Sequence, residues 1–320
     1  MNFRINVGGK KLKFLFRRRR FRFVYLPRRY QGVSLSRLII PLVFFCAISL
    51  FAESPEKKLT VAVTLSPYAK IVREIAGNQA DVVTLVPPNA NPHTFEPRPA
   101  TLRSFSAASI YLSDGSGLDA AWLPRFKGVN PGVEIRDISQ GVSWMQEEHS
   151  HENGERAELD PHLWNSPRTA LLVAANVCSV LVETDAPNAG VYRTNLEVFS
   201  KRLSDLDVKF SAAVKGLSEE KRTFIVFHPS YGYLARDYGL HQVAVEMDGK
   251  EPKPRDLQRL IGSAKKFQVK TIFVQPQFSR RAVESLSREI QAKIVSVDPL
   301  AYDFESELLK FLDALTAEAK

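Results

Sequence analysis

The clearest hydrophobic pattern in this sequence lies in the middle of the chain, between residues 187 and 217. Apolar residues recur there at alternating spacings of four and three, which places them on one face of a helix. The members of this seam are Tyr192, Leu196, Phe199, Leu203, Leu206, Phe210, Ala213 and Leu217. We expect Asp185 to be the N-cap and Pro187 to occupy the first turn, where its missing N–H is harmless. At about 1.5 Å per residue the predicted helix is roughly 45 Å long, enough for a strut between two lobes.

Short apolar runs alternate with helical stretches on both sides of this helix. The predicted strands are 58–63, 81–86, 109–113, 133–138, 223–227, 241–247, 270–275 and 293–297. The predicted helices are 66–76, about 100–107, one around Trp122, about 167–183, 230–238, 254–267, 279–290 and one from Phe304. This alternation implies parallel pairing, so the sequence predicts two α/β lobes, each with a mostly parallel sheet flanked by helices. Because the flanks look globular, a coiled-coil dimerisation helix is the less favoured reading of the central seam.

The remaining segments suggest the domain organisation. Residues 139–160 contain almost no apolar side chain after Met145 and predict a solvated loop. We expect an N-terminal lobe at 53–166 that includes this loop, a helical linker at 167–217 and a C-terminal lobe at 218–320. Open parallel sheets bind ligands beyond the carboxyl ends of their strands, so the ligand is expected in the cleft between the lobes.

The formal charge of +9 is concentrated at the start of the chain. Residues 1–52 hold 12 Lys and Arg and no acidic residue, whereas the remainder holds 32 basic and 35 acidic residues. The mildly acidic remainder argues against a nucleic-acid-binding protein. Residues 38–51 are mostly apolar and follow a basic region, which is typical of a secretory signal peptide and shorter than the roughly 20 residues of a membrane helix. We expect 1–52 to be a signal peptide with an over-extended N-terminus, cleaved near Ala52, and a periplasmic mature protein.

Two alternatives for this N-terminal segment stay open. The less favoured alternative is that the apolar segment stays uncleaved as a membrane anchor. The other is that translation starts near Val33 or Leu35, which would give the signal peptide an ordinary length. Lipidation of Cys46 is disfavoured because Phe44 and Phe45 occupy positions that need small residues. Cys178 lies among apolar residues and is expected to be buried, so no disulfide is expected in the mature chain.

Candidate metal ligands lie near the ends of predicted strands. His93 and His228 each follow such a strand, Asp298 directly follows another, and His162 lies where the first lobe joins the linker. Three imidazoles and one carboxylate are an ordinary ligand set for zinc or a neighbouring transition metal. Each residue also has a structural alternative, because His162 suits a turn cap, His228 a helix entry and Asp298 an N-cap. His241 begins a strand and is expected to be structural.

Five segments carry a resemblance to a known family. They are "NPHTFEPRP", "DPHLWNSP", "FHPSYGYLARDYGL", "GKEPKPRDLQRLI" and "VQPQFS". In this order, with the long helix between the second and third, they resemble the ZnuA-like zinc-uptake ABC-transporter substrate-binding proteins over essentially all of residues 58–320. The resemblance implies two α/β lobes joined by a rigid helix. It also implies ligand roles for the set His93, His162 and His228, with Asp298 where many relatives supply a fourth, acidic ligand.

Two features depart from the family pattern. Gln275 stands where zinc-type relatives often have an acidic residue, and the histidine-rich loop is reduced to "EEHSHENGE". We expect neither feature to touch the proposed ligands. His149 and His151 in this loop are at most weak accessory metal sites, and a solvated polar loop is an equally good interpretation.

The leading functional hypothesis is a monomeric, non-catalytic receptor that captures zinc outside the cytoplasm and delivers it to the membrane permease of an ABC importer. Zinc is favoured because manganese-type relatives typically carry a glutamate where His228 stands, and manganese prefers more oxygen ligands. A manganese receptor or an adhesin of the same fold is the alternative. A zinc hydrolase with Glu96 as general base is weaker, because H-E-x-x-H is absent and a proline follows Glu96.

Overall fold

The computed structural model describes residues 4–7, 10–13, 58–146, 159–246, 254–278 and 281–317. The chain separates into two compact units, Met1–Glu56 and Lys57–Lys320. In the first unit, strand β1 (Arg4–Val7) pairs antiparallel with β2 (Lys10–Lys13), and the predicted apolar core of the signal peptide lies outside the described residues. None of the helices in the described part of the chain combines the length and apolar character that a membrane crossing requires.

The N-terminal half of the second unit is built on a parallel sheet with the strand order β4-β3-β5-β6. Its strands are β3 (Leu59–Val63), β4 (Ala80–Thr84), β5 (Ile110–Ser113) and β6 (Glu134–Asp137). The helices between them are α2 (Ser66–Ala76), α3 (Pro99–Ser106) and α4 (Gly117–Val129). Helix α2 has Pro67 in its first turn and stops at Gly77, whose φ of 57° suits glycine. Each of these elements was predicted.

The C-terminal half repeats this architecture with the strand order β10-β9-β7-β8, again all parallel. Its strands are β7 (Thr223–Val226), β8 (His241–Ala244), β9 (Thr271–Val274) and β10 (Lys293–Ser296). Its helices are α7 (Gly232–Tyr238), α8 (Pro254–Lys266), α9 (Arg281–Ile290) and α10 (Phe304–Thr316). Counted within each lobe, both sheets run second, first, third, fourth strand, so the predicted two-lobe α/β fold is confirmed.

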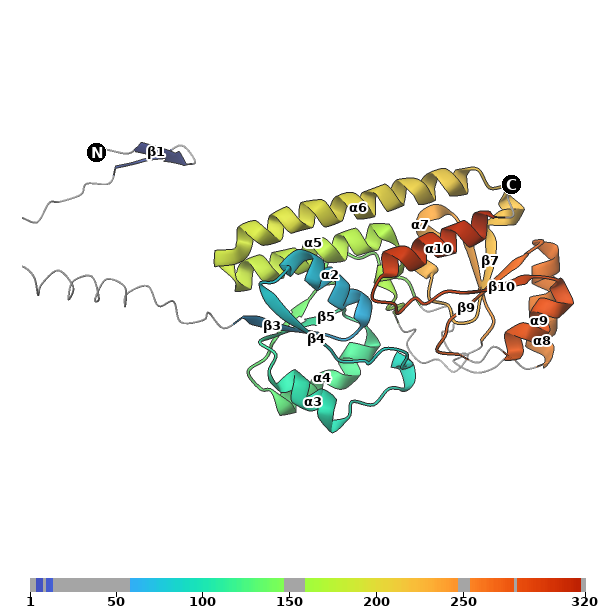
Figure 1. Ribbon diagram of the computed structural model, residues 1–320, viewed down its shortest axis with the longest axis horizontal. Coiled ribbons are helices and arrows are strands. Elements are labelled where there is room, and N and C mark those ends of the chain that lie inside the picture. The colour runs from blue at the N-terminus through green and yellow to red at the C-terminus, as the bar shows by residue number, and fades with distance from the viewer. Residues whose placement is uncertain are drawn as a thin grey trace, which may run out of the picture. The chain divides into compact units, whose positions relative to one another are not determined.

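Two long helices join the lobes, α5 (Pro167–Thr184) and α6 (Ala189–Lys215). Helix α6 has 27 residues, which is about 40 Å of helix. Figure 1 shows α6 lying along both lobes, and it packs against α5, against α2 of the N-terminal lobe and against α10 of the C-terminal lobe. The predicted seam faces these helices, with Tyr192, Phe199, Leu203, Leu206 and Phe210 buried. Because helices of the same chain cover it, the seam is not left for a coiled-coil partner.

The start of the strut differs from the prediction. Residues Ala186–Asn188 form a 3-10 turn, so Pro187 lies in that turn and α6 begins at Ala189. The Asp185 carboxylate accepts hydrogen bonds from the Tyr192 hydroxyl and the Asn188 amide instead of capping a backbone N–H. The expected N-cap role of Asp185 was therefore wrong, because a tight turn separates it from the helix.

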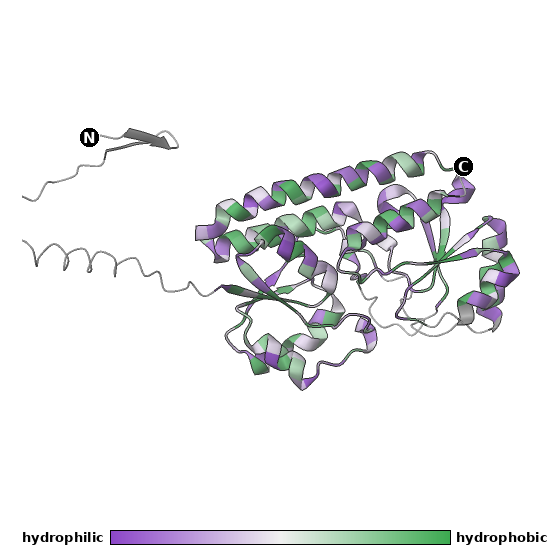
Figure 2. Cartoon of the chain, in the orientation of Figure 1, coloured by the Kyte–Doolittle hydropathy of each residue, from purple (hydrophilic) through white to green (hydrophobic). Residues whose placement is uncertain are grey.

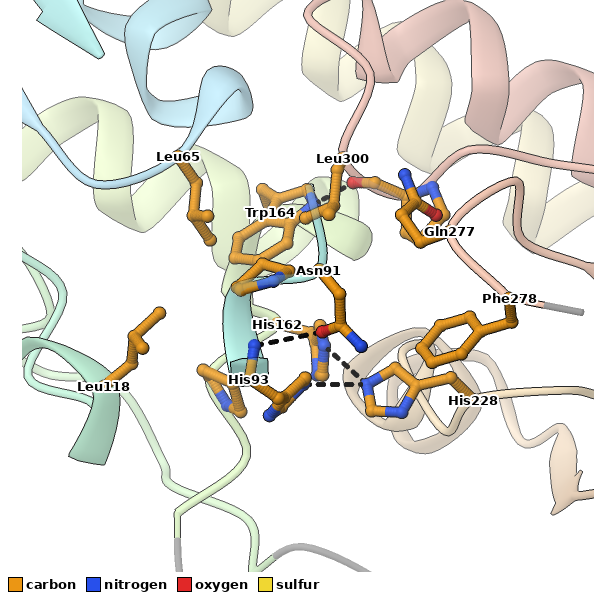
Figure 3. Close-up of a pocket in the computed structure, with 13 residues that line it drawn as sticks. Leu65, Asn91, His93, Leu118, His162, Trp164, His228, Gln277, Phe278 and Leu300 are labelled. Carbon is orange, nitrogen blue, oxygen red and sulfur yellow. Dashed lines mark hydrogen bonds between the residues drawn. The ribbon is translucent and has the colours of Figure 1, made fainter. Parts of the chain in front are cut away.

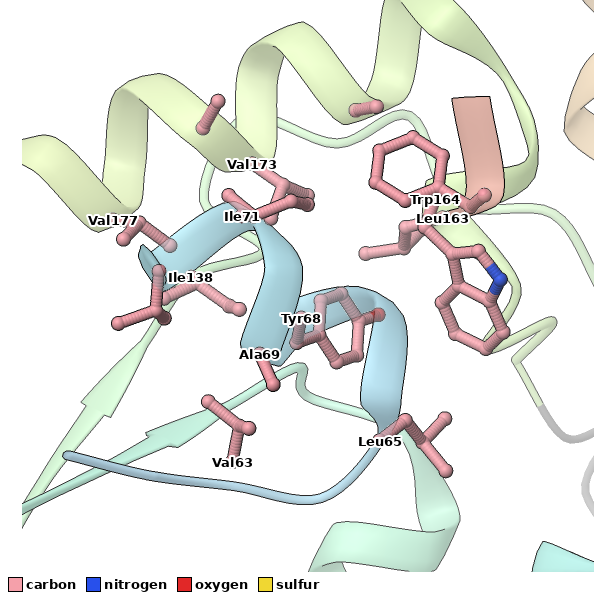
Figure 4. Close-up of a cluster of buried hydrophobic side chains, with 14 of the residues drawn as sticks. Val63, Leu65, Tyr68, Ala69, Ile71, Ile138, Leu163, Trp164, Val173 and Val177 are labelled. Carbon is pink, nitrogen blue, oxygen red and sulfur yellow. The ribbon is translucent and has the colours of Figure 1, made fainter. Parts of the chain in front are cut away.

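The hydrophobic core is continuous from the first sheet through the linker helices to one side of the second sheet. Figure 4 shows its centre, where Tyr68 and Ile71 of α2 lie beside Val173 and Val177 of α5 and beside Trp164. The cluster extends to Phe273 and Phe311 in the C-terminal lobe, while a smaller cluster lies beneath α8 and α9. Figure 2 shows the same contrast between inside and outside, because the central strands are mostly hydrophobic and the outer helices carry both hydrophobic and hydrophilic residues. The two lobes therefore share one packed core.

Candidate metal centre

Three histidines reach one point from three different segments of the chain (Figure 3). His93 lies in a short 3-10 turn after β4, and its backbone N–H donates to Asn91 Oδ1 at 3.0 Å. His162 lies directly before another 3-10 turn ahead of α5, and His228 follows β7. A proline adjoins each histidine in the sequence, and its fixed φ restricts the backbone there.

The ring nitrogens of these histidines are spaced as a metal site requires. His228 Nε2 lies 3.2 Å from His93 Nε2 and 3.4 Å from His162 Nε2, and all three ligand atoms lie within 4.8 Å of one another. Bonds of 2.0–2.1 Å to a tetrahedral zinc ion separate the bound nitrogens by about 3.3–3.4 Å. The two separations from His228 Nε2 therefore match those around a small ion, and the third pair lies within 4.8 Å.

Two of the three rings have an environment that keeps them neutral. Partial desolvation of its ring and the neighbouring imidazoles of His228 and His162 lower the pKa of His93, although the residue as a whole is exposed. Desolvation also lowers the pKa of His228, although the carboxylate of Glu246 opposes this effect. Neutral imidazoles hold a free lone pair for a cation at neutral pH.

The sequence analysis missed two buried carboxylates, which contact the Nδ1 atoms of His162 and His228. Asp160 Oδ1 lies 2.8 Å from His162 Nδ1, and Glu246 Oε1 lies 2.6 Å from His228 Nδ1. Asp160 and Glu246 are 4% and 2% exposed, so both are shielded from water. The sequence offers only weak signals for these two residues. Asp160 is an aspartate two residues before a histidine, and Glu246 is a single polar residue after an edge strand, and both patterns are common.

Gln275 corrects a further expectation. Its side-chain oxygen accepts a hydrogen bond from the backbone N–H of His228 at 3.1 Å, and its amide donates to the backbone carbonyl of His228 at 2.7 Å. The prediction that Gln275 does not touch the proposed ligands was therefore wrong. A side chain that closes two hydrogen bonds around one residue fixes the backbone from which His228 projects.

Asp298 lies at the carboxyl end of β10, as expected, but outside the three-histidine cluster. Its Oδ1 accepts hydrogen bonds from Gln277 Nε2 at 2.8 Å and from the Leu300 N–H at 3.0 Å. The carboxylate thus bonds to its own loop and to the segment that follows β9.

A small cavity adjoins the cluster between the lobes. It has a volume of about 40 Å³ and is lined by the three histidines together with apolar side chains, among them Leu65, Leu118, Trp164 and Leu300. This volume suits one or two water-sized ligands and excludes an organic substrate of ordinary size.

The sequence analysis singled out four further residues. His149 and His151 fall outside the described residues. His241 is exposed at the start of β8 and pairs with Glu219 at 3.2 Å. Glu96 forms an exposed ion pair with Arg125 at 3.3 Å and is not part of the histidine cluster.

Comparison with known proteins identifies the family of this chain. A family model described as "Zinc-uptake complex component A periplasmic" (ZnuA) matches residues 61–320. The chain belongs to the ZnuA family. The high-affinity zinc uptake system protein ZnuA of Bacillus subtilis is 28% identical to this ZnuA-family chain over 278 residues, which cover 82% of this chain and 86% of that protein.

Solved structures resemble this ZnuA-family chain over most of its length. A crystal structure of ZnuA has 32% sequence identity and a TM-score of 0.77, and it covers 82% of this chain and all of its own. The substrate-binding protein FpvC of Pseudomonas aeruginosa, solved in complex with Mn²⁺, has 27% identity and a TM-score of 0.71, with 82% and 100% covered. Relatives thus include proteins named for zinc and a structure that holds manganese, and the family is one of metal-binding receptors.

Proposed function

We propose that this protein is an extracytoplasmic, non-catalytic receptor that captures zinc and delivers it to the permease of an ABC-type importer. The observation that carries the proposal is the convergence of three imidazoles, with His228 Nε2 3.2 Å and 3.4 Å from the Nε2 atoms of His93 and His162, beside a cavity too small for an organic substrate. His93, His162 and His228 are the proposed ligands, and the protein acts as a monomer.

Metal analysis of untagged residues 53–320 tests this function. We expect one zinc ion per chain and a large loss of affinity when any one of the three histidines is replaced by alanine. His241→Ala is the matched control, because His241 pairs with a carboxylate on the surface, and it should leave the affinity unchanged. A wild-type protein that binds no divalent ion would end the proposal.

Asp298 is the proposed fourth ligand. In this structure its Oδ1 accepts from Gln277 Nε2 and from the Leu300 N–H, both of which hold the carboxylate in place. We expect Asp298→Ala to weaken zinc binding measured by competition with a chelator. An unchanged affinity would instead assign the fourth position to water, for which the cavity has room.

The choice of zinc over manganese rests on the donor atoms. Three imidazole nitrogens suit zinc, whereas manganese prefers oxygen, and most sites bind zinc more tightly in any case. The informative experiment therefore measures how a substitution changes the ratio of the affinities for zinc and manganese. His228→Glu should lower the preference for zinc over manganese in competition titrations, and a wild-type protein that already prefers manganese would favour the manganese alternative.

Export belongs to the same proposal. We propose that residues 1–52 direct secretion and that cleavage occurs near Ala52, so that mass spectrometry of the mature protein finds an N-terminus near Glu53. A mature protein that keeps the arginine-rich segment would contradict this.

His149 and His151 are proposed as weak accessory ligands only. At the edges of their loop, Gln146 and Leu159 form a β-bridge, and the Asp160 N–H donates to Met145 O at 2.9 Å. Because the two ends lie side by side, deletion of residues 147–155 can be closed by a short turn. The deletion should leave one tightly bound ion per chain.

A further inference from the structure

We propose that Glu246 and Asp160 are positioning residues that hold His228 and His162 in the metal-binding tautomer before the ion arrives. This inference rests on the proposed function, since it concerns the same three histidines. It adds two residues that touch no metal and assigns them a share of the affinity.

The first step is the hydrogen-bond chemistry. An ionised carboxylate only accepts hydrogen bonds, so an imidazole whose Nδ1 lies 2.6–2.8 Å from a carboxylate oxygen carries its proton on Nδ1. The lone pair then lies on Nε2. In both residues Nε2 is the atom that faces the other histidines. Each carboxylate thus selects the tautomer that a metal ion needs.

The second step is that Asp160 is held in place. The backbone N–H of His162 donates to Asp160 Oδ1 at 2.9 Å, and the Tyr233 hydroxyl donates to the Asp160 carbonyl at 2.9 Å. Gly232, the first residue of α7, leaves the space that Asp160 occupies, because a Cβ there would lie 2.6 Å from Asp160 Oδ2. The C-terminal lobe therefore places the carboxylate that orients a histidine of the linker.

The third step concerns the energetic state of Glu246. Its Oε1 contacts His228, whereas its Oε2 is buried without a hydrogen-bond partner among the described residues. A buried carboxylate with an unpaired oxygen costs stability. A divalent cation bound to His228 Nε2 offsets this loss of stability. Three neutral imidazoles leave the positive charge of the cation uncompensated, and the nearby carboxylate balances part of it. Glu246 is thus better suited to the metal-bound protein than to the metal-free protein.

The third histidine lacks such a partner. Within the described residues, the His93 ring makes its one hydrogen bond to His228, and His93 is the most exposed of the three. The site therefore consists of two oriented histidines on the linker and the C-terminal lobe, which His93 of the N-terminal lobe completes.

The test compares Glu246→Gln and Glu246→Leu with the surface variant Glu219→Gln. Glu219 also pairs with a histidine, His241, but both residues are exposed and neither belongs to the histidine cluster. We expect both Glu246 variants to bind zinc about 10- to 100-fold more weakly, with unfolding temperatures of the metal-free protein equal to or above that of wild type. Glu219→Gln should leave both quantities unchanged.

Two further measurements separate positioning from a merely structural role. Nitrogen-15 NMR of the metal-free protein should show His228 as the Nδ1–H tautomer in wild type and as a mixture in Glu246→Leu. Gly232→Ala should weaken zinc binding by displacing Asp160, whereas Gly262→Ala in α8, where a Cβ meets nothing within 4 Å, should not.

Zinc affinity within twofold of wild type in both Glu246 variants, or an unchanged His228 tautomer, would overturn the inference. So would a loss of affinity seen only where the metal-free protein has also unfolded. If His228→Ala keeps full affinity, the proposed function itself fails. If His228→Ala loses zinc and the Glu246 variants do not, the positioning role alone fails.

Discussion

Gln275 illustrates how one side chain can set the position of a histidine that we propose as a metal ligand. It is fully buried, and its amide closes hydrogen bonds with both the N–H and the carbonyl of His228 and lies 3.2 Å from Ser230 Oγ. An amide is needed because one atom has to accept and the other has to donate. A glutamate has the same shape and can supply only the acceptor at neutral pH.

We therefore predict that Gln275→Glu destabilises the protein by about 1–3 kcal/mol and weakens zinc binding, because a carboxylate oxygen would face the His228 carbonyl. Urea denaturation of the metal-free protein and zinc titration measure the two effects. Gln242→Glu is the matched control. Gln242 accepts from the Tyr231 N–H at 2.8 Å, but its Nε2 has no partner among the described residues, so its loss removes no hydrogen bond. Equal costs for the two substitutions would contradict this account.

At this scale the sequence indicated the clustered histidines better than the residues that hold them. His93, His162 and His228 were predictable because histidine is rare here and each lies next to a proline near the end of a regular element. Glu246 and Gln275 were not, since a single polar residue after a strand is common and its role depends on which distant residue lies opposite. The hydrogen bonds of Asp298 to Gln277 and to the Leu300 N–H depend on how two loops meet in space, which no local sequence pattern encodes.

At the scale of elements, helix α6 connects the lobes through charge as well as through its apolar seam. Arg202 lies 2.8 Å from Glu74 of α2 and 3.2 Å from Glu305 of α10, so one guanidinium joins a helix from each lobe. Burial alone would raise the pKa of Glu74, but its pairing with Lys70 and Arg202 lowers it below its ordinary value. Arg202 therefore connects the two lobes through ion pairs, in addition to the apolar contacts that α6 makes with both lobes.

We predict that Arg202→Met, which keeps the aliphatic stem, lowers the free energy of unfolding by roughly 1 kcal/mol at neutral pH. A lowered carboxylate pKa contributes stability above pH 4.5, the ordinary value for glutamate, and loses it as the pH falls through the folded-state value. The difference between variant and wild type should therefore shrink below pH 4.5 in denaturation curves. Lys201→Met, next along α6, removes only the exposed pair with Asp205 and should cost less at every pH.

The elements themselves were largely predictable because their signals are local. Periodicity indicated every strand and helix of the two sheets, and the buried central strands β7 and β9 are continuous apolar runs, as parallel sheets require. The start of α6 was not predictable. A proline after Asp185 suits both a helical first turn and a 3-10 turn, and the hydrogen bond from Tyr192 to Asp185 decides between them.

At the scale of the whole molecule, the site draws on every part of the fold. His93 belongs to the N-terminal lobe, His162 to the approach of the linker and His228 to the C-terminal lobe, while one apolar cluster runs through all three parts. The repeated strand order places the carboxyl ends of strands from both sheets beside the cluster. A single ion bound there contacts every part of the molecule.

The last prediction follows from this connection. An ion that binds only the folded state stabilises it by RT ln(1 + [L]/Kd), which is about 2.7 kcal/mol at a free concentration of 100 times Kd. For a chain of this size that corresponds to a rise of roughly 5–10 °C in the unfolding temperature. Because the ligands and the core span both lobes, we expect calorimetry of residues 53–320 to show one transition that shifts as a whole when zinc is added. His93→Ala should greatly reduce the shift while leaving the metal-free transition in place, since His93 is exposed and its ring, among the described residues, hydrogen-bonds only to His228. Two transitions of which zinc moves only one would mean that the lobes unfold separately and that the ion is held by one of them.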